Sequence, residues 1–469
     1  MEGDWSAAVL VQFVDQAGEA IGKPMQYSIN VTKEELGGTC LVLLNESPDI
    51  PYSLFVNGQE IVGTLLSSLQ GSALEEIVTV KFQRQAQFRV NAVTRNSGDL
   101  PGHTEAVVCA AFSQDSLYLA TGSGDTTVRL WDVGGVYCLR ICQGHKNWVL
   151  CVSWAPDTVR LASGCRSGSI IIWDPTTAQP VRTLNGHRDW ITSLSWEPLH
   201  RSAPVRRLAS SSKDTTIRIW DTVSGHTLVI LSGHSLCVTT VRWGGIGFLY
   251  SGSQDRTVRV WKDKDGSLYK TLNGHAHWVN MLALSTDGAL INGVFNPLAN
   301  YSTMSLEEKV NLAKQRFERL YKNVGERVVS GSDDKTAIMW NPECHGNPIT
   351  RLTGHQQSIN DIAFSPDGKY IATASFDRSI KLWNGMDAKF ISTFRGHVQA
   401  VYKISWSPDR QYLVSCSADS TVKVWRVETC KMERDLPGHA DEVYAVDWSP
   451  DGEYVASAGK DRVVKIWHY

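Results

Sequence analysis

A Gly-His pair returns at near-regular intervals along the chain, and this period constrains the fold more than any other feature. Successive histidines of these pairs lie 42, 42, 47, 41, 80, 42 and 42 residues apart. A period of roughly 40 residues indicates an array of similar structural units, each stacked on its neighbours. The pairs are Gly102-His103, Gly144-His145, Gly186-His187, Gly233-His234, Gly274-His275, Gly354-His355, Gly396-His397 and Gly438-His439.

A tryptophan closes a run of β-forming residues after each pair, and an aspartate six residues earlier precedes seven of these eight tryptophans. In the second repeat, Ser167 takes the place of the aspartate. Runs such as VVCAAFS, YLATGS and TTVRLWD, separated by Gly, Asp and Pro, predict four short strands per unit. Such a unit resembles the WD repeat, one blade of a propeller. We therefore predict a mainly β fold with an eight-bladed WD-repeat β-propeller.

The repeated His, Asp and Trp side chains predict a hydrogen-bond network inside each blade, because a buried carboxylate needs partners. Ser, His and Asp are also the residue types of a hydrolytic triad, but a catalytic set occurs once, whereas this set recurs around the ring. The chain also lacks a GxxxxGK[ST] phosphate-binding loop, so we expect no enzymatic activity. The structural network residues include His103, Asp125, Trp131, His187, Asp214, Trp220, His439, Asp461 and Trp467.

The ring must be closed by a strand from upstream of the first repeat. The sequence reaches Tyr469 two residues after Trp467, so the last blade has only three strands of its own. We predict that residues 86–95, AQFRVNAVTR, supply the missing outer strand because of their β character. The propeller would then span residues 86–469.

The interval of 80 residues marks an insertion in blade five, at about residues 288–325. Ser305 and Glu308 form a capping-box pattern. The apolar residues that follow share one helical face, which predicts a helix. This face either packs against its own blade or binds a partner.

A different pattern occupies residues 8–85, which carry no WD marker. Strand, strand, helix, strand and strand follow in this order, and Thr32 with Glu35 forms a second capping box. The order resembles the small α+β ubiquitin-like fold, the β-grasp. Because Val80 runs on through Lys81 toward the propeller, conjugation through a free Gly-Gly tail is excluded, and docking is the expected role.

Composition excludes several classes of protein. Lys plus Arg number 46 and Asp plus Glu number 48, so bulk charge does not favour nucleic acid or membrane. No apolar stretch approaches the roughly 20 residues of a membrane span, and the N-terminus lacks the features of a secretion signal. The ten cysteines form no CxxC pair. We expect reduced thiols in a cytosolic or nuclear protein.

Three tryptophans stand three residues after the His of their repeats and are candidates for a partner-binding surface. They are Trp148, Trp190 and Trp278, at a position expected near the central channel. Aromatic and basic side chains together are typical of binding hot spots and also suit RNA stacking or phosphate contacts. The alternative is that the indoles pack between blades. The basic candidates nearby are Lys146, Arg166, Arg188 and Lys213.

The leading domain and the runs SWEPLH, LASSSKD, WVNMLALSTD, FRGHVQAVY and LPGHADEVYAVDWSPDG together resemble the Notchless family over nearly the whole chain. The resemblance implies a monomeric scaffold for assembly of the 60S ribosomal subunit in the nucleus and nucleolus. Its propeller would dock on ribosomal proteins, assembly factors or rRNA of the pre-60S particle. The AAA ATPase midasin would grasp the ubiquitin-like domain. The family name also implies a role at the intracellular region of Notch.

The resemblance also implies one ligand residue, a carboxylate just before the last strand of the ubiquitin-like domain. Counting back from Phe88-Arg89-Val90 leads to Glu75, with Glu76 as the register-shifted alternative. This carboxylate would complete the coordination of Mg²⁺ in the MIDAS site of midasin, so the metal belongs to the partner and the chain needs no cofactor of its own. Without the resemblance, both residues would be read as solvated loop charges.

A ubiquitin-pathway substrate receptor is the competing function. Such receptors usually carry an Arg two residues after the WD dipeptide, whereas this chain has WDVG, WDPT and WDTV. The missing Arg disfavours that alternative.

Overall fold

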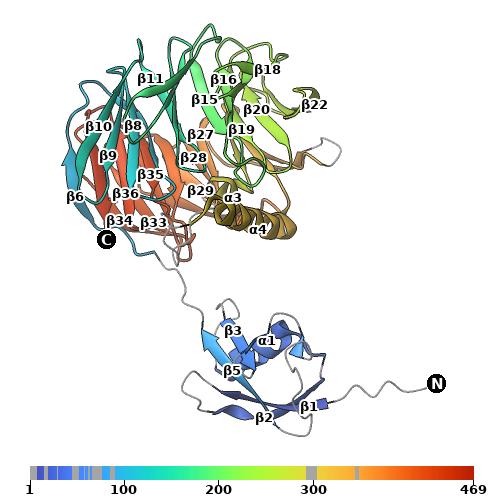
Figure 1. The fold of residues 1–469 in the computed structure, drawn as a ribbon. Coiled ribbons are helices and arrows are strands. Elements are labelled where there is room, and N and C mark those ends of the chain that lie inside the picture. Colours follow the sequence, from blue (N-terminus) through green and yellow to red (C-terminus); the bar gives the residue numbers. More distant parts are fainter. Residues whose placement is uncertain are drawn as a thin grey trace. The chain divides into compact units, whose positions relative to one another are not determined.

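The computed structural model contains two compact units, residues 1–89 and 90–469, whereas the sequence placed the boundary between residues 85 and 86. Both units are drawn as ribbons in Figure 1. The structure describes residues 8–14, 20–28, 30–44, 52–56, 59–61, 64–65, 77–84, 90–291, 304–343 and 348–469. The nine cysteines within these ranges are all free. No helix among these residues is long and apolar enough to cross a membrane.

The first unit is a five-stranded mixed sheet with a helix. The strand order is β2-β1-β5-β3-β4, and β1 pairs with β5 in parallel. Phe13, Leu36 and Leu54 are fully buried in its core. This arrangement is the β-grasp fold that the sequence predicted. Its elements are β1 (Ala8–Val14), β2 (Ala20–Ser28), α1 (Lys33–Leu43), β3 (Tyr52–Val56), β4 (Gln59–Glu60) and β5 (Val78–Arg84).

Helix α1 begins at the predicted capping box. The Thr32 hydroxyl accepts from the Glu35 N–H, and the Glu35 carboxylate accepts from the Thr32 N–H. The helix contains Gly37 although glycine disfavours helices. A Cβ at Gly37 would lie 1.9 Å from the Tyr52 ring, so the glycine is needed where strand β3 packs against the helix.

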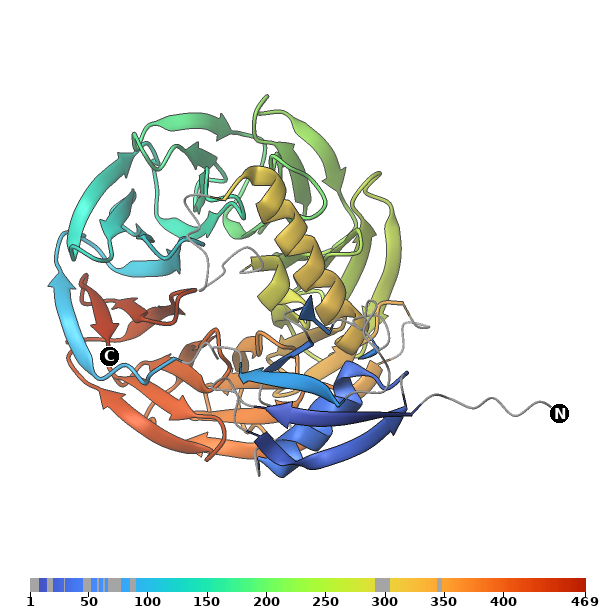
Figure 2. The same cartoon turned by 60° about the horizontal axis from the view of Figure 1, so that its bottom comes forward.

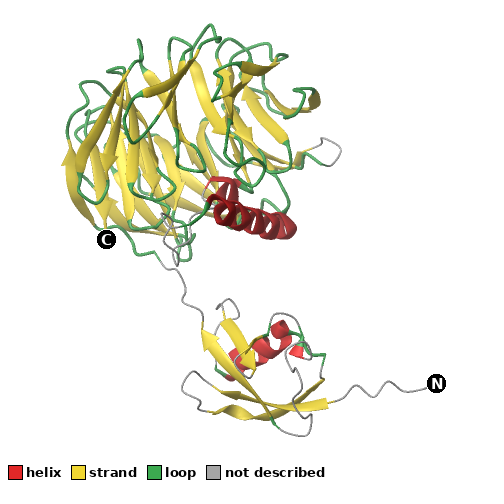
Figure 3. Ribbon diagram, in the orientation of Figure 1, coloured by secondary structure: helices red, strands yellow, loops and turns green. Residues whose placement is uncertain are grey.

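The second unit is a ring of eight four-stranded antiparallel sheets within residues 90–469, which confirms the predicted propeller (Figure 2). Almost all of its regular structure is strand (Figure 3). From inner to outer strand, blades one to four are β7 (Val107–Phe112), β8 (Tyr118–Ser123), β9 (Thr127–Asp132), β10 (Tyr137–Gln143); β11 (Val149–Trp154), β12 (Leu161–Cys165), β13 (Ile170–Trp173), β14 (Pro180–Leu184); β15 (Ile191–Trp196), β16 (Arg207–Ser212), β17 (Ile217–Asp221), β18 (Thr227–Leu231); β19 (Val238–Trp243), β20 (Phe248–Ser253), β21 (Thr257–Lys262) and β22 (Leu268–Asn273).

Blades five to eight repeat the same antiparallel pattern. In the same order they are β23 (Val279–Leu284), β24 (Val328–Ser332), β25 (Ala337–Trp340), β26 (Pro348–Leu352); β27 (Ile359–Phe364), β28 (Tyr370–Ser375), β29 (Ser379–Asn384), β30 (Phe390–Arg395); β31 (Val401–Trp406), β32 (Tyr412–Ser417), β33 (Val422–Arg426), β34 (Lys431–Leu436); β35 (Val443–Trp448), β36 (Tyr454–Gly459), β37 (Val464–His468) and β6 (Arg95–Leu100).

Burial follows the position of each strand within its blade. The second strand of blade two, β12, is buried at every residue because neighbouring blades cover both faces of the sheet. The outer strand β14 is exposed at four of its five residues. Tryptophans at the ends of inner strands also join the blades, since Trp154 and Trp196 each donate an indole N–H to a carbonyl of the preceding inner strand.

The ring closes where blade eight meets blade one. Each inner strand packs against the next, and β35 packs against β7. The Asp447 carboxylate accepts from the Phe112 N–H at 3.0 Å across this seam. Blade eight takes its outer strand from upstream of the first repeat, since β6 pairs with β37.

The position predicted for the closing strand is wrong. Of residues 86–95, only Arg95 belongs to β6, and residues 86–89 lie outside the described residues. Residues 90–94 pack as a loop, in which the Val90 N–H donates to Asp409 and Val93 is buried. The exposed outer strand is set by its pairing with β37 rather than by β propensity. The repeat itself carried the better signal, since β6, like the outer strand β18, ends two residues before its Gly-His pair.

The blade-five insertion lies between β23 and β24 and contains α3 (Asp287–Ile291) and α4 (Leu306–Val324). Helix α4 begins at the predicted capping box of Ser305 and Glu308. Its apolar face packs under neighbouring blades, because Ala313 joins a core cluster containing Trp196 and Phe317 stacks on His200 with ring centroids 4.3 Å apart. The apolar face of α4 therefore packs against the propeller itself. It contacts blades three and four as well as its own blade five (Figure 1).

Candidate partner-binding face of the propeller

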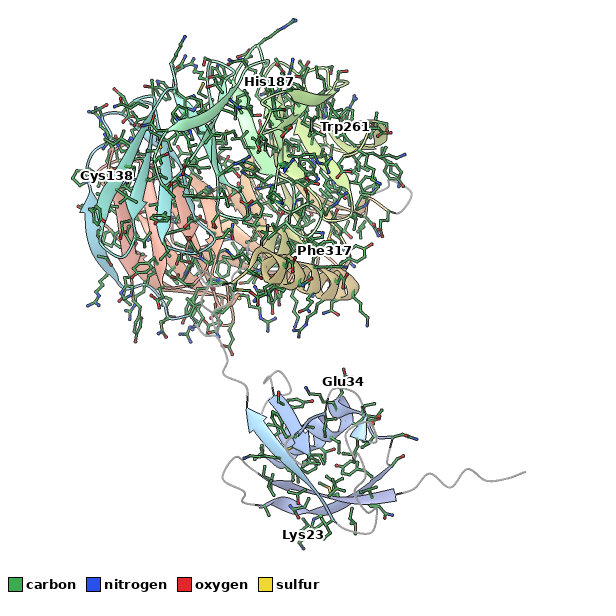
Figure 4. The ribbon with its side chains drawn as sticks, in the orientation of Figure 1. Lys23, Glu34, Cys138, His187, Trp261 and Phe317 are labelled. Atoms are coloured by element: carbon green, nitrogen blue, oxygen red, sulfur yellow. The ribbon has the colours of Figure 1, made fainter. Side chains whose placement is uncertain are left out.

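Each blade except blade two contains a chain of hydrogen bonds from the tryptophan to the aspartate. In blade three, the Trp220 indole N–H donates to Ser210 Oγ at 2.8 Å. Ser210 Oγ lies 2.8 Å from His187 Nε2, and His187 Nδ1 lies 2.8 Å from Asp214 Oδ2 (His187 is labelled in Figure 4). Since the carboxylate only accepts, Nδ1 carries the proton and Nε2 accepts from the serine hydroxyl.

The same network occurs in the first and last blades. His103 Nδ1 lies 2.7 Å from Asp125, and Trp131 and His103 share the hydroxyl of Thr121. In blade eight, His439 Nδ1 lies 2.7 Å from Asp461, and Trp467 donates to Ser457, which also contacts His439. These imidazoles are almost fully buried. The network therefore stabilises each blade and offers no open Ser–His pair to a substrate.

The aspartate is the electrostatic centre of the network. Burial would raise the pKa of Asp214, but hydrogen bonds from His187 and Thr216 hold it well below its usual range. The carboxylate also accepts from the Arg188 N–H at 3.0 Å and the Thr216 N–H at 3.0 Å. Burial lowers the pKa of His103 in blade one despite its bond to Asp125, which keeps that imidazole neutral.

Blade two lacks this centre. Trp173 donates to Ser163, which lies 2.6 Å from His145 Nε2. Ser167 replaces the aspartate, and His145 Nδ1 is buried without a hydrogen-bond partner among the described residues. Blade two therefore keeps the hydrogen bonds that join Trp173, Ser163 and His145, and lacks the bond from histidine to a carboxylate.

The loops that hold the His of every blade and the Asp of seven blades lie at one end of the ring, which we call the His–Asp face. The three candidate tryptophans lie on this face, because each of their carbonyls accepts from the turn that follows the second strand of the same blade. Trp148 accepts from the Arg166 N–H, Trp190 from the Lys213 N–H and Trp278 from the Asp333 N–H, at 2.9 to 3.0 Å. Insertion helix α4 joins the first and second strands of blade five, so it lies at the opposite end, as the labels His187 and Phe317 show in Figure 4.

Trp190 lies between two cations from adjacent blades. The Arg166 guanidinium carbon lies 4.3 Å from the ring centroid, and Lys213 Nζ lies 4.5 Å from it. The structure thus brings together three of the predicted residues in a cation–π cluster. The indole is half-buried, so it both packs between blades and remains part of the surface.

The other two tryptophans are more open. Trp148 is 40% exposed and lies over Gly124 of blade one, where an added Cβ would approach the indole to 3.1 Å. Trp278 is 43% exposed, and its ring centroid lies 5.3 Å from that of His277. These exposed indoles can offer flat apolar surface to a partner.

Lys146 and Arg188 are exposed on the same face, each directly after the His of its blade. Among the described residues, neither side chain makes a cation–π contact with a tryptophan like those of Arg166 and Lys213. They add positive charge beside the cluster rather than joining it.

Sequence reasoning missed a second group on the His–Asp face, in blades seven and eight. The Tyr402 hydroxyl donates to Glu442 at 3.0 Å, and Lys460 lies 3.2 Å from Asp441. Tyr402 also contacts Tyr444, with ring centroids 5.5 Å apart. The periodic position of Glu442, three residues after His439, was the available signal. The face therefore carries a cation–π cluster at blades two and three and carboxylates paired with a lysine and a tyrosine at blades seven and eight.

A cavity of about 360 Å³ occupies the central channel. Its lining includes Arg242, Lys403, Asp361 and Asp447. The two aspartates bridge blades, since Asp361 accepts from the Ile404 N–H and Asp447 from the Phe112 N–H. These polar groups therefore serve to join inner strands. Within the described ranges no group of three or more His, Cys, Asp or Glu side chains is placed to hold a metal ion.

Glu75 and Glu76, the candidate ligands for a partner's Mg²⁺, lie outside the described residues.

The fold defines a class of protein: a WD-repeat propeller with a β-grasp domain. A family model described as "WD domain, G-beta repeat" matches residues 95–132, 136–174, 178–221, 225–262, 346–384, 388–426 and 430–468. The unmatched stretch between residues 262 and 346 holds the blade-five insertion, which interrupts the fifth repeat. A second model, described as "NLE (NUC135) domain", matches residues 9–69.

The chain belongs to the Notchless family. It is 46% identical over 399 residues to the Notchless protein homolog of Arabidopsis thaliana, which covers 84% of each chain. Identity to Protein Notchless of Drosophila melanogaster is 48% over 368 residues, covering 77% of this chain and 75% of the relative. Ribosome assembly protein 4 of Saccharomyces cerevisiae is 50% identical over 121 residues, 25% of this chain and 23% of the relative.

A solved structure with the same architecture is that of the computationally designed Ika8 protein. The TM-score is 0.63 at 26% identity, with 80% of this chain and 100% of the designed chain covered. This likeness concerns the propeller fold.

Proposed function

We propose that this chain is a non-catalytic scaffold for assembly of the large ribosomal subunit, working in the nucleus and nucleolus. The observation that carries this proposal is the match to a relative named ribosome assembly protein 4, within a family match over most of the chain. The buried, repeated His–Asp networks support a structural rather than catalytic role for these residues. The chain would act as a monomer.

In this proposal the His–Asp face docks on the pre-60S particle. Trp148 and Trp278 provide exposed aromatic surface, and Arg166 and Lys213 flank Trp190. Indole and guanidinium groups are frequent hot spots in interfaces, and they also suit rRNA bases and phosphates. Lys146 and Arg188 would add electrostatic attraction to the same partners.

The β-grasp unit would be the handle for the ATPase midasin. Glu75 would offer its carboxylate to the Mg²⁺ of the midasin MIDAS site, with Glu76 as the alternative. Mg²⁺ prefers oxygen ligands, so a carboxylate is chemically suited to an open coordination position. The metal would come with the partner, and the chain would bring no cofactor of its own.

Notch-related scaffolding is a second candidate, favoured by the names of the Arabidopsis and Drosophila relatives. It differs from ribosome assembly in partner rather than in architecture. The same surface would then bind the receptor's intracellular region.

Sedimentation of extracts from cells that express the chain tests the docking proposal. The wild type should co-migrate with pre-60S particles, and the double variant Trp148→Ala/Trp278→Ala should shift to the light fractions. Leu228→Ala, an exposed apolar residue on outer strand β18, is the matched control and should migrate as wild type. A wild-type chain found only in light fractions would contradict the ribosomal role.

Binding to an isolated midasin MIDAS domain tests the handle. Binding should require Mg²⁺, disappear with EDTA, and be lost with Glu75→Ala but not with Glu76→Ala. Loss with Glu76→Ala alone would move the ligand by one residue. Binding that is indifferent to metal would contradict the carboxylate bridge.

A further inference from the structure

Blade two carries a second replacement beside the missing aspartate. Cys165 ends strand β12 at the position where six other blades have a serine that accepts from the Asp N–H and donates to a carbonyl, as Ser212 does in blade three. The two substitutions are two residues apart in one turn. Cys165 stands where six other blades have a serine, and Ser167 stands where the other seven blades have an aspartate. The six serines are Ser123, Ser212, Ser253, Ser332, Ser375 and Ser417.

The thiol is surrounded by hydrogen-bond donors. Cys165 Sγ lies 2.9 Å from Ser167 Oγ and 3.0 Å from Ser169 Oγ. His145 is 7% exposed, and its Nδ1, which in seven blades points at the aspartate, has no hydrogen-bond partner within the described part of the chain. The Nδ1–H therefore lacks the anion that every other blade supplies to its histidine.

The charged and titratable groups around the turn favour an anion on sulfur. His145 comes from the loop before β11, together with exposed Lys146, and Arg166 is exposed on the turn itself. The neighbouring thiol Cys151 differs, because burial raises its pKa well above the usual value. Blade three packs against the turn through the carbonyls of His187 and Asp189 near Gly168.

The pKa of the Cys165 thiol follows from these contacts. Burial would raise it, but the nearby His145 and the hydroxyls of Ser167 and Ser169 lower it to about 6. The pKa values of three other propeller thiols shift in the opposite direction. Burial raises the pKa of Cys109, Cys142 and Cys416 to about 12.

We propose that Cys165 is a thiolate beside His145, in the one blade that lacks the aspartate, and that it is the site at which hydroperoxides oxidise this propeller. The thiolate sulfur attacks one oxygen of hydrogen peroxide and the O–O bond breaks, which gives a sulfenic acid. The departing hydroxide takes up a proton from solvent and leaves as water. Sulfur is oxidised and the peroxide is reduced, so no further reactant is needed.

Oxidation would alter the His–Asp face beside its cation–π cluster. The sulfenic acid is neutral at neutral pH, so the negative charge beside His145 is lost while the sulfur gains an oxygen inside a buried turn. Arg166 belongs to this turn and holds both the Trp148 carbonyl and the Trp190 ring. The modification would therefore couple the oxidation state of one cysteine to the geometry of the proposed docking surface.

Thiolate ultraviolet absorbance of the full chain is the first test, because it requires no reagent to enter the turn. Wild type minus Cys165→Ser should titrate as one thiolate with a midpoint near pH 6. The serine variant should fold, since serine stands here in six other blades. His145→Gln should remove this low titration, and circular dichroism should show that both variants keep the propeller. A difference spectrum without thiolate at neutral pH would overturn the proposal.

Oxidation itself is the second test. The full chain is treated with hydrogen peroxide, quenched with catalase and unfolded in the presence of dimedone, which marks sulfenic acids for peptide mass spectrometry. Cys165 should be labelled at least about tenfold faster than any other cysteine, and His145→Gln should slow this labelling about tenfold. Labelling spread evenly over the cysteines, or absent from Cys165, would overturn the assignment of the oxidation site.

Discussion

Blades two and three both have four strands, a buried tryptophan and a histidine in the loop before the inner strand. They differ in the residue that faces Nδ1 of this histidine. In blade three, Asp214 accepts from His187, from two backbone N–H groups and from a threonine hydroxyl. In blade two, Ser167 stands in that place and His145 keeps only its bond to Ser163.

The comparison separates what forms a blade from what reinforces it. The apolar packing of Trp173 and Trp220 is alike, since both indoles are at most 1% exposed and both donate to a serine. The carboxylate is therefore dispensable in one blade of a ring whose neighbours hold it on both sides. The position that lost the carboxylate is then free to carry different chemistry.

Removing the tryptophan should have the largest effect and should not distinguish the blades. Trp173→Ala and Trp220→Ala should each destabilise the propeller by about 3–5 kcal/mol, because each leaves a large cavity between sheets. Urea unfolding of the full chain, followed by circular dichroism, measures both. A difference of more than about 2 kcal/mol between them would break the claim that the two cores are equivalent.

Removing the turn residue should distinguish the blades clearly. Asp214→Ala leaves the Nδ1–H of His187 and two backbone N–H groups without an acceptor, so it should cost about 3 kcal/mol. Ser167→Ala should cost under about 1 kcal/mol, since no such set of donors depends on it. Equal losses in the same unfolding experiment would show that blade two has a network not visible in its contacts.

The pH dependence of stability sharpens the same contrast. Hydrogen bonds keep the pKa of Asp214 below its unfolded value despite burial. Its contribution to stability is therefore present above about pH 4 and is lost as pH falls through the folded pKa. Asp214→Asn should flatten the decline of the thermal midpoint below pH 4, whereas Ser167→Ala should leave that decline unchanged. A decline that is as steep in Asp214→Asn as in wild type would contradict this assignment.

The smallest effect concerns the cations that blades two and three contribute to Trp190. Arg166→Gln or Lys213→Gln should each cost about 0.5–1 kcal/mol, the usual range for a cation–π contact at an exposed site. Arg188→Gln, which removes a nearby charge without such a contact, is the control and should leave the thermal midpoint unchanged. Identical shifts in all three variants would mean that net charge, and not contact with the ring, matters.

The sequence predicted the elements whose information is local or periodic. The GH and WD markers predicted the propeller, and the capping boxes at Thr32 and Ser305 placed the starts of both long helices. Periodicity also placed Trp148, Trp190 and Trp278 at one end of the ring, because equivalent residues of a repeat occupy equivalent positions.

Features that depend on pairing between distant segments could not be predicted from local or periodic patterns in the sequence. The closing strand β6 contains Asn96, Gly98 and Asp99, which are poor β-formers, and only the partner strand β37 gives them strand geometry. Likewise, Tyr402 and Glu442 come from adjacent blades and meet only when the ring forms. The sequence showed the missing aspartate of blade two, but not that His145 and Cys165 would be left together.

The closing strand β6 also determines how a mechanical load would enter the ring. Residues 90–94 connect directly to β6, so tension applied to the N-terminal side of the chain reaches the propeller through the Val90–Asp409 hydrogen bond and then the Arg95–His468 pair. Further along, Lys465 and Asp99 form an ion pair at 2.5 Å beside the last backbone pairs of this seam. The seam that completes the ring is thus also its tether point. A sustained pull would act first on the one blade built from both ends of the propeller sequence.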